Sequence, residues 1–270
     1  MINILLVGES KHFEKSLFSI AIQTVKEEMS VIMVSSKKHD LSSFQKKIKI
    51  EEVITKEKSM GKRREIALQR AKGDYVLFMN SGDVFYDVFA LNNLYKNVEG
   101  YDVVIGGIEN RERQYSCNYL VGNLYRRKYL TSHKLVFHDS DGPENGFHKL
   151  VFMSGADIVY SSDIIYHENT SIREDNDWVL EDAVFAVNLA KKRDYSPHNI
   201  ALMIYDTVLY YAHLYHQNQL SNGNYKDFIS LYYEYQKYLS EEDYQYISDI
   251  NLTNREVDDF YCTKFIEDFY

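Results

Sequence analysis

A small polar turn with one carboxylate follows a buried apolar run in the first third of the chain. The run Tyr75 to Met79 (YVLFM) has the length and composition of a buried strand, and it leads directly into Asn80, Ser81, Gly82 and Asp83. In open α/β sheets, ligands bind outside the carboxyl ends of the strands. Asp83 is therefore a candidate ligand for Mg²⁺ or Mn²⁺, hard cations that bind one or two carboxylates together with substrate phosphate oxygens. The competing interpretation is that Asp83 caps the helix after the turn.

Other titratable residues offer weaker candidates for a metal site. His167 follows a later apolar run and could be a further ligand of the metal, although a structural histidine is the favoured interpretation. The pair Glu181 and Asp182 is expected to lie on a solvated helix face. A crowded segment could also bind metal, but it has no tight zinc spacing, and the polarity of a loop explains it equally well. Its members are His138, Asp139, Asp141, Glu144 and His148.

The elements that would position these residues alternate along the first hundred residues. Apolar runs bounded by helical patterns are typical of a doubly wound sheet that is covered on both faces. The predicted strands are Ile2 to Val7, Val31 to Val34, Val53 to Ile54, Tyr75 to Met79 and Asp102 to Ile105, and the predicted helices lie within His12 to Glu27, Gly61 to Lys72 and Asp87 to Asn97.

The alternation weakens in the second half of the chain. Helices are predicted over Asn123 to Leu130 and Glu144 to Met153, and short strands over Leu135 to Phe137 and Ile158 to Tyr160. Beyond Ser171 the pattern is helical and rich in tyrosine, with fourteen of the 24 tyrosines between positions 195 and 270. Core packing is the first explanation for these aromatics. The alternative is a surface for a protein partner, a second copy of the chain or a membrane-linked acceptor.

The composition excludes several classes of protein. Of the 270 residues, 45% are hydrophobic and 26% charged, and only 12 are glycine and 2 proline, which argues against disordered, collagen-like and all-β chains. Cys117 and Cys262 lack the spacing of a disulfide framework or a zinc site. The N-terminus has no pattern of a secretory signal, and no apolar run approaches the ~18 residues of a membrane span. We therefore expect a cytoplasmic protein, with peripheral membrane association left open.

Charge is uneven along the chain. The net charge of −9 combines a basic segment, Lys37 to Lys72, with twelve Lys or Arg against five acids, and an acidic one, Glu241 to Tyr270, with nine acids against two bases. The basic segment could attract a phosphorylated small molecule or could be a solvated helix face. Nucleic-acid binding is disfavoured, because no extended basic groove with interleaved aromatics is present elsewhere.

Several segments together resemble the family 2 glycosyltransferases of GT-A fold. These are SLFSIAIQT (Ser16 to Thr24), GKRREIALQRAKGDYVLFMNSGD (Gly61 to Asp83), GNLYRRKYL (Gly122 to Leu130) and the segment Phe137 to His167, and they span about residues 1 to 172. The resemblance implies an α/β fold with a Rossmann-type mixed sheet flanked by helices. We expect the GT-A-like domain over residues 1–170, with a nucleotide-sugar half at 1–100 and an acceptor half at 101–170, followed by a helical region at 171–270.

The resemblance implies a hexosyltransferase-type enzyme with Mn²⁺ or Mg²⁺ as cofactor. It would transfer a sugar with inversion from a nucleotide diphosphate donor, most commonly a UDP-sugar in this family, to a hydroxyl of a saccharide or glycoconjugate. Asp83, with His167 as a further ligand, would bind the metal. Glu144 would be the general base, with Asp141 in reserve, and helix N-terminal charge stabilisation is the competing role of both acids. The remaining candidates would bind the donor, and they are Gly8, Ser35, Ser36, Lys62, Arg64, Asn80 and Ser81.

The chain departs from the family pattern at the donor site. Gly8 stands where the family has Asn, and Ser35 and Ser36 replace the acidic pair that contacts the nucleoside. The turn keeps only the last of its acids, Asp83, and the catalytic acidic pair is reduced to Glu144 followed by Asn145. These departures motivate the alternative function, a catalytically inactive GT-A-fold subunit that acts as a binding or scaffold partner.

Overall fold

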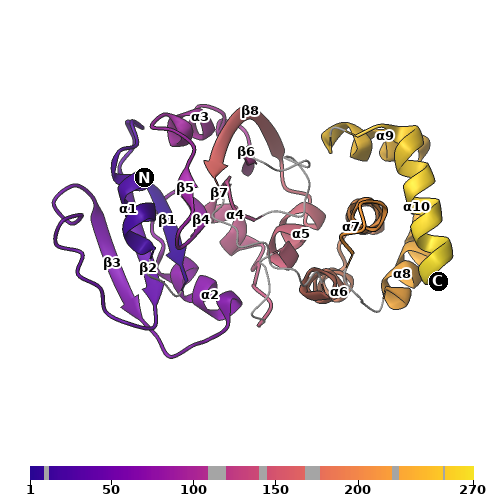
Figure 1. Cartoon of the computed structure of the whole chain (residues 1–270), viewed down its shortest axis with the longest axis horizontal. Helices are drawn as coiled ribbons and strands as arrows, with labels where there is room; N and C mark the ends of the chain where they lie inside the picture. The colour runs from indigo at the N-terminus through magenta and orange to yellow at the C-terminus, as the bar shows by residue number, and fades with distance from the viewer. Residues whose placement is uncertain (9–11, 109–119, 140–144, 168–176, 221–224, 252) are drawn as a thin grey trace. The chain divides into compact units, whose positions relative to one another are not determined.

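The computed structural model describes residues 1–8, 12–108, 120–139, 145–167, 177–220, 225–251 and 253–270 (Figure 1). The chain forms two compact units. The sheet unit comprises Met1–Gln114, Leu120–Gly142 and Ala156–Ser171, and the helical unit comprises Tyr115–Tyr119, Pro143–Gly155 and Ile172–Tyr270. Each unit is therefore assembled from three separate segments of the chain.

The sheet unit is built on a mixed sheet with strand order β3-β2-β1-β4-β7-β6-β8-β5. The first four strands of that order are mutually parallel, β7 runs antiparallel to both of its neighbours, and β8 is parallel to β6 and antiparallel to β5. The strands are β1 (Ile2–Val7), β2 (Met29–Ser35), β3 (Lys49–Ile54), β4 (Tyr75–Asn80), β5 (Val84–Phe85), β6 (Val103–Ile108), β7 (Asn123–Arg126) and β8 (Ile158–His167).

Helices α1 (Phe13–Ala21), α2 (Met60–Arg70), α3 (Ala90–Tyr95) and α4 (Arg127–Ser132) connect these strands. Helix α2 packs on β1 and β2, and α3 packs on β6, β7 and β8. Helix α2 begins at Ser59, whose side chain accepts a hydrogen bond from the Lys62 amide at 3.2 Å, as expected for an N-cap serine. Helix α1 buries an apolar stripe that contains Phe13, Leu17 and Ile20.

Two sequence predictions in the second half of this unit are wrong. Residues 123–126 of the expected helix Asn123 to Leu130 form strand β7, because Leu124 and Tyr125 are buried between β4 and β6 and tertiary pairing overrides the local pattern. No strand forms over Leu135 to Phe137. The strand predicted at Ile158 to Tyr160 continues to His167, which brings its carboxyl end into register with β5.

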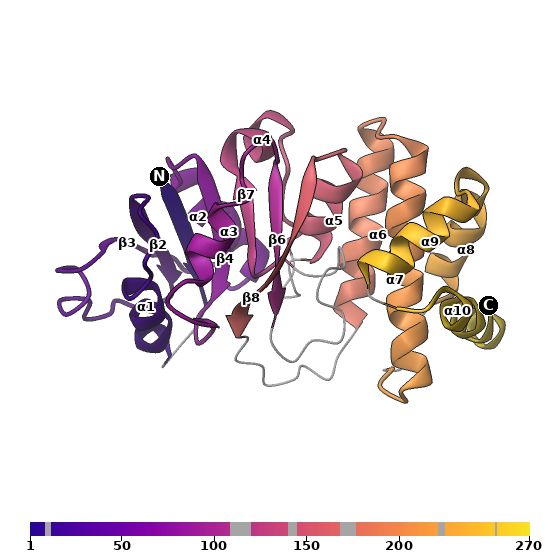
Figure 2. The same ribbon diagram turned by 90° about the horizontal axis from the view of Figure 1, so that it is seen from above.

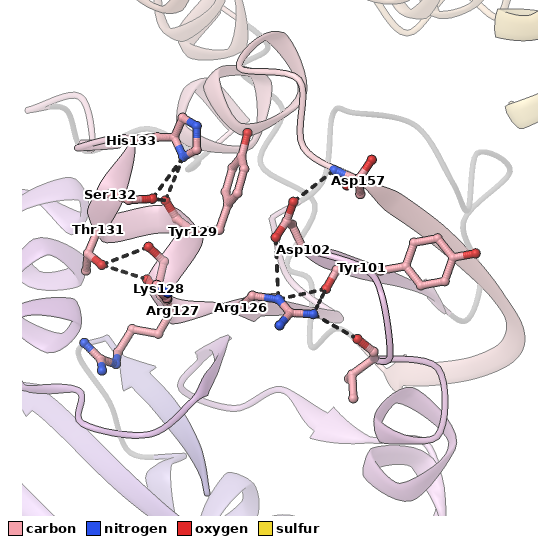
Figure 3. Close-up of polar contacts among 11 residues, drawn as sticks. Tyr101, Asp102, Arg126, Arg127, Lys128, Tyr129, Thr131, Ser132, His133 and Asp157 are labelled. Carbon is pink, nitrogen blue, oxygen red and sulfur yellow. Dashed lines mark hydrogen bonds and ion pairs between the residues drawn. The ribbon is translucent and has the colours of Figure 1, made fainter.

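A polar network links the amino ends of β6 and β8 to the carboxyl end of β7 (Figure 3). Arg126, at the end of β7, donates to the Tyr101 carbonyl at 2.7 Å and lies 3.5 Å from the Asp102 carboxylate. Asp102 also accepts from the Asp157 amide at 3.2 Å, immediately before β8. Asp102 precedes β6, so this network lies at the amino ends of β6 and β8.

The helical unit contains α5 (Asn145–Met153), α6 (Asp177–Lys192), α7 (Pro197–His216), α8 (Lys226–Tyr235), α9 (Glu241–Ile250) and α10 (Arg255–Phe269). Some of its aromatics fill the interior: Tyr211 and Tyr225 are buried and meet edge to face, and both lie against Phe265. This contact forms where α10 packs on α7 (Figure 2). Core packing therefore accounts for these rings. Other aromatics of the unit are exposed, and they are Tyr233, Tyr238, Tyr246, Phe260 and Tyr270. Within the described ranges, no helix has the length and apolarity needed to cross a membrane.

A buried carboxylate joins three segments of the helical unit. Asp258 of α10 is fully buried and accepts hydrogen bonds from His213 Nε2 at 2.7 Å, from the Ser248 hydroxyl at 2.6 Å and from the Thr253 hydroxyl at 2.6 Å. Burial acts to raise the pKa of Asp258, but these hydrogen bonds outweigh it and hold the pKa below its usual value.

The expectation that Asp182 lies on a solvated helix face is wrong. Its side chain is buried, and its Oδ2 lies 3.4 Å from the amide nitrogen of Gly146, in the first turn of α5. A Cβ on Gly146 would lie 2.8 Å from the Asp182 carbonyl oxygen. Helices α5 and α6 can therefore pack this closely only because residue 146 has no side chain. The neighbouring His148 is fully buried, and desolvation, with the Lys149 charge, lowers its pKa to about 3. His148 is therefore neutral and belongs to the core.

Candidate ligand site at the carboxyl edge of the parallel strands

The turn after β4 lies at the carboxyl edge of the parallel strands, beside the end of β1. The Ser81 amide donates to the Val7 carbonyl at 2.9 Å, and the Asp83 amide donates to the Asn80 carbonyl at 3.1 Å, which closes the turn. Asp83 is 2% exposed, so its carboxylate is held in the body of the sheet unit. This edge is the general ligand position of open α/β sheets.

Helix α1 fixes the backbone of the turn. The Ser16 hydroxyl donates to the Asp83 carbonyl at 2.7 Å and accepts from the Gly82 amide at 2.8 Å. One turn later, the Ser19 hydroxyl accepts from the Phe85 amide at 3.3 Å. Two serines of one helix face therefore satisfy three backbone groups between residues 82 and 85.

Gln23, two residues after the end of α1, extends this support to α3. Its Nε2 donates to the Asp87 carbonyl at 2.8 Å, and its Oε1 accepts from the Leu91 amide at 2.9 Å. The serine and glutamine of the segment SLFSIAIQT thus have a structural task, which is to attach α1 to the chain that follows the turn.

Strand β8 holds the carboxylate itself. The Tyr166 hydroxyl donates to Asp83 Oδ2 at 2.7 Å and accepts from the Asn80 amide at 3.3 Å. Tyr166 is fully buried and pairs with Phe85 in the β5 to β8 register, which places its ring next to the turn. The phenol therefore connects both ends of the turn.

Two consecutive arginines of α2 bring positive charge to this edge. Arg64 Nη2 donates to Asn80 Oδ1 at 2.5 Å, and Arg64 is fully buried. Arg63, 2% exposed, donates from Nε to the Glu57 carbonyl at 2.7 Å and from Nη1 to the Gly8 carbonyl at 3.4 Å. Both guanidiniums therefore lie at this edge, each held by a hydrogen bond to an oxygen beside the turn or at the end of β1.

Gly8, at the end of β1, allows the turn to approach closely. A Cβ at this position would lie 2.2 Å from the Ser81 hydroxyl oxygen, and the backbone has a φ of +154°. Any side chain at position 8 would collide with the turn. This contact explains in physical terms why the chain has glycine where the related pattern has asparagine.

The other predicted donor residues occupy different environments. Ser35 is buried, and its hydroxyl donates to the Lys37 carbonyl at 2.7 Å, while Ser36 is half-buried. Lys62 is exposed in the first turn of α2, where its Nζ lies 3.6 Å from the Asp139 carboxylate. The structure thus brings Gly8, Ser81, Asn80, Arg64 and Asp83 into one connected group and places Ser35 and Lys62 in local contacts outside it.

His167 is paired in the sheet with Val84, the residue that follows Asp83. Successive residues of a strand point to opposite faces, so Tyr166 and His167 leave β8 on opposite sides. The alternative metal site shares Glu144 and Asp141, but its member His148 is buried in the core. Glu144 and Asp141, the predicted base and its reserve, lie outside the described residues. Their roles stay predictions.

The residues at the turn fit a divalent cation that is bound mainly by substrate. In the described part of the chain, no three His, Cys, Asp or Glu side chains come together as a metal cluster. Mg²⁺ and Mn²⁺ in phosphate sites need only one or two protein carboxylates, because phosphate oxygens and water supply the other ligands. The buried Asp83 carboxylate, with its orientation fixed by Tyr166, meets that requirement.

Part of this site could have been found from the sequence. Arg64 falls on the same helical stripe as Gly61 and Leu68, and all three are buried, so the 3.6-residue period indicates that its guanidinium faces the sheet. The contact of Tyr166 with Asp83 spans 83 positions, and no local pattern predicts it. Ser16 belongs to the segment SLFSIAIQT, and its bond to the turn joins positions 67 apart, so no local pattern predicts it either.

The fold is similar to those of solved glycosyltransferases, at low sequence identity. Residues 1–349 of TarS from S. aureus with UDP-GlcNAc match with a TM-score of 0.61 and 16% identity over 99% of this chain and 89% of that one. The mannosyltransferase PcManGT from Pyrobaculum calidifontis, with GDP-Man and Mn²⁺, has a TM-score of 0.54 and 15% identity over 88% and 84%. Glucosyl-3-phosphoglycerate synthase from Mycobacterium tuberculosis has a TM-score of 0.51 and 17% identity over 71% and 78%.

The chain spans less than two thirds of the length of other TarS structures that it matches. It covers 65% of residues 1–349 of TarS with UDP and 55% of a longer TarS chain. No protein-family model matches the sequence, and no curated protein sequence matches it. The structural likeness shows a GT-A-like fold, and the prediction of a mixed α/β sheet with flanking helices and a helical C-terminal region is confirmed.

Proposed function

We propose that this protein is a glycosyltransferase that moves a sugar from a nucleotide diphosphate donor to an acceptor hydroxyl. The observation that carries the proposal is the buried Asp83 carboxylate at the carboxyl edge of a GT-A-like sheet, next to the positive charge of Arg63 and Arg64. The solved relatives with UDP-GlcNAc and with GDP-Man and Mn²⁺ support a nucleotide-sugar donor.

The residues of the edge suit the departure of a diphosphate. Asp83 would hold Mn²⁺ or Mg²⁺, which when bound neutralises charge on the leaving group, whereas His167 leaves β8 on the face opposite Tyr166 and is not assigned to the metal. The Arg63 and Arg64 guanidiniums are fixed by hydrogen bonds before any ligand arrives, so their stabilisation of a developing anion needs little reorganisation. Lys62, exposed at the start of the same helix, can add a mobile third charge.

Acceptor activation is the second requirement of the reaction. An acceptor hydroxyl attacks the anomeric carbon while a carboxylate takes its proton. We assign this base role to Glu144, with Asp141 in reserve. A single displacement of this kind inverts the anomeric configuration, which is the outcome that we propose for this chain.

The test is a donor panel assayed for transfer and for hydrolysis. The wild-type chain is incubated with UDP- and GDP-sugars, with Mn²⁺ or with a chelator, and released nucleotide is measured. We expect turnover with at least one donor, its loss on chelation, and a decrease of about 10²-fold or more for Asp83→Asn, in line with the loss of one transition-state charge contact.

Asp102→Asn is the matched control, because Asp102, with its side chain 20% exposed, is another aspartate of the sheet unit but lies at the amino end of β6, on the opposite side from the turn. It should retain turnover. If no donor is turned over and none binds, the proposal fails. If a donor binds tightly without turnover, the chain is the inactive GT-A-fold binding subunit instead.

A further inference from the structure

The Asp83 carboxylate receives its orientation from a directed chain of hydrogen bonds. The Asn80 amide donates to the Tyr166 hydroxyl at 3.3 Å, and that hydroxyl donates to Asp83 Oδ2 at 2.7 Å. Because the amide can only donate, it occupies a lone pair of the phenol oxygen and directs the phenol hydrogen to the carboxylate. Hydrogen bonds in such a series strengthen one another in a buried environment.

Tyr166 controls the part of Asp83 that the rest of the turn does not fix. Ser16 holds the Asp83 backbone carbonyl and the Gly82 amide, whereas the bond from Tyr166 is made to the carboxylate. The turn has no second acid to share a cation, since Asn80 and Gly82 replace the acids expected there. The direction of one carboxylate therefore decides where a cation and its phosphate ligands can lie.

The phenol ring is itself rigidly placed. Tyr166 is fully buried, its backbone pairs with Phe85 across β5 and β8, and its ring meets the Phe85 ring edge to face at 6.5 Å. A buried tyrosine hydroxyl needs hydrogen-bond partners, and the partners of Tyr166 are the Asn80 amide and the Asp83 carboxylate, the two ends of the turn.

We propose that Tyr166 is a positioning residue for divalent-cation binding by Asp83, an inference that rests on the proposed function. Groups that orient a ligating carboxylate typically contribute 10- to 100-fold to metal affinity. The role is distinct from folding, because it predicts a change in cation affinity in a protein that remains folded.

The experiment compares Tyr166→Phe with Tyr125→Phe. Tyr125 is a matched control, since it is also fully buried in the sheet unit and its hydroxyl donates to the Leu120 carbonyl at 3.2 Å, away from the turn. Mn²⁺ affinity is measured from the electron paramagnetic resonance signal of the free ion, with and without UDP, and folding is monitored by circular dichroism.

We expect Tyr166→Phe to weaken Mn²⁺ binding by about 10-fold or more and Tyr125→Phe to leave it unchanged. Equal Mn²⁺ affinity in wild type and Tyr166→Phe, with loss in Asp83→Asn, would overturn the positioning role and leave the proposed function intact. A wild-type chain that binds neither Mn²⁺ nor UDP would overturn both.

A second variant covers the case in which Tyr166→Phe does not fold. Fluorotyrosine at position 166 keeps the ring and a hydroxyl that donates to the Asp83 carboxylate, so the positioning bond is retained. Mn²⁺ affinity should then stay within about twofold of the wild type, and a loss of about 10-fold or more contradicts the inference.

Discussion

Arg64 donates a hydrogen bond of 2.5 Å from Nη2 to the side-chain oxygen of Asn80 and is itself fully buried. The contact ties the first half of α2 to the end of β4. The partner of Arg64 therefore lies in the turn that carries Asp83. A change in the geometry of this turn would also move the guanidinium that we predict to contact the diphosphate.

Removing the Asn80 side chain should destabilise the sheet unit. Asn80→Ala deletes the acceptor of a buried, charged donor, and hydrogen bonds to charged groups contribute about 1.5 to 3 kcal/mol. We expect a loss of that size, measured as a lower urea midpoint. Asn80→Asp is the matched variant: it keeps an acceptor and adds charge, so its midpoint should be at least that of the wild type. A midpoint for Asn80→Ala equal to the wild type would show that the contact contributes nothing.

The close approach of β1 to the turn can be tested by a double-mutant cycle. Gly8→Ala places a Cβ 2.2 Å from the Ser81 hydroxyl oxygen, and overpacking of this kind costs about 1 to 3 kcal/mol. Ser81→Gly removes the colliding atoms, so adding it to Gly8→Ala should recover part of the loss, the remainder reflecting the unusual φ of position 8. Additive effects of the two substitutions on the free energy of unfolding would exclude the steric explanation.

Lys62 should affect ligand binding without affecting stability. Both Lys62 and its partner Asp139 are largely exposed, and exposed ion pairs contribute about 0 to 1 kcal/mol. Lys62→Ala should therefore leave the melting temperature nearly unchanged and weaken UDP binding several-fold in titration calorimetry, more so at low salt. Asp139→Asn releases Lys62 from its partner and should bind UDP at least as tightly as the wild type. Unaltered UDP affinity in Lys62→Ala would exclude a donor role.

The helical unit should lose stability in acid through Asp258. Its pKa is lower in the folded chain than the ordinary value of 3.8, so its carboxylate stabilises the fold fully above that pH. This contribution is lost as the pH falls through the lower folded pKa. Calorimetric melting between pH 2.5 and 6 should show a decline below about pH 4. Asp258→Asn should flatten the decline, and Asp249→Asn, at an exposed acid of α9, should leave it unchanged.

The first half of the fold could be predicted from the sequence because its signals are local. Each of the strands β1, β2 and β4 is a continuous apolar run that is buried on both faces, and Arg64 and Leu68 lie on one helical period. Strand β7 was predicted as helix, because its four residues acquire their conformation from pairing with β4 and β6. Pairing with strands that are distant in the sequence produces no periodic pattern of apolar residues, so the sequence alone did not predict it.

The candidate site divides in the same way. The turn and Asp83 could be predicted, since a polar turn after a buried strand marks a sheet edge. The supporting residues could not: Tyr166 reaches Asp83 across 83 positions and Ser16 across 67. Asp182 was predicted to lie on a solvated helix face because it stands beside Glu181, but its side chain is buried against α5.

Helix α5 belongs to the helical unit although it lies between two segments of the sheet unit in the chain, so cleavage at one position cannot separate the two units. Helix α5 precedes β8 in the chain, yet it packs against α6 and α7. A fragment that ends at residue 170 would complete the sheet but strip α5 of both neighbours and expose Phe147, Leu150 and Val151, at about 1.5 to 3 kcal/mol for each side chain. Shortening this protein to its sheet alone would thus give an aggregation-prone fragment, and circular permutation or removal of α5 along with the C-terminal helices is the route that respects its connectivity.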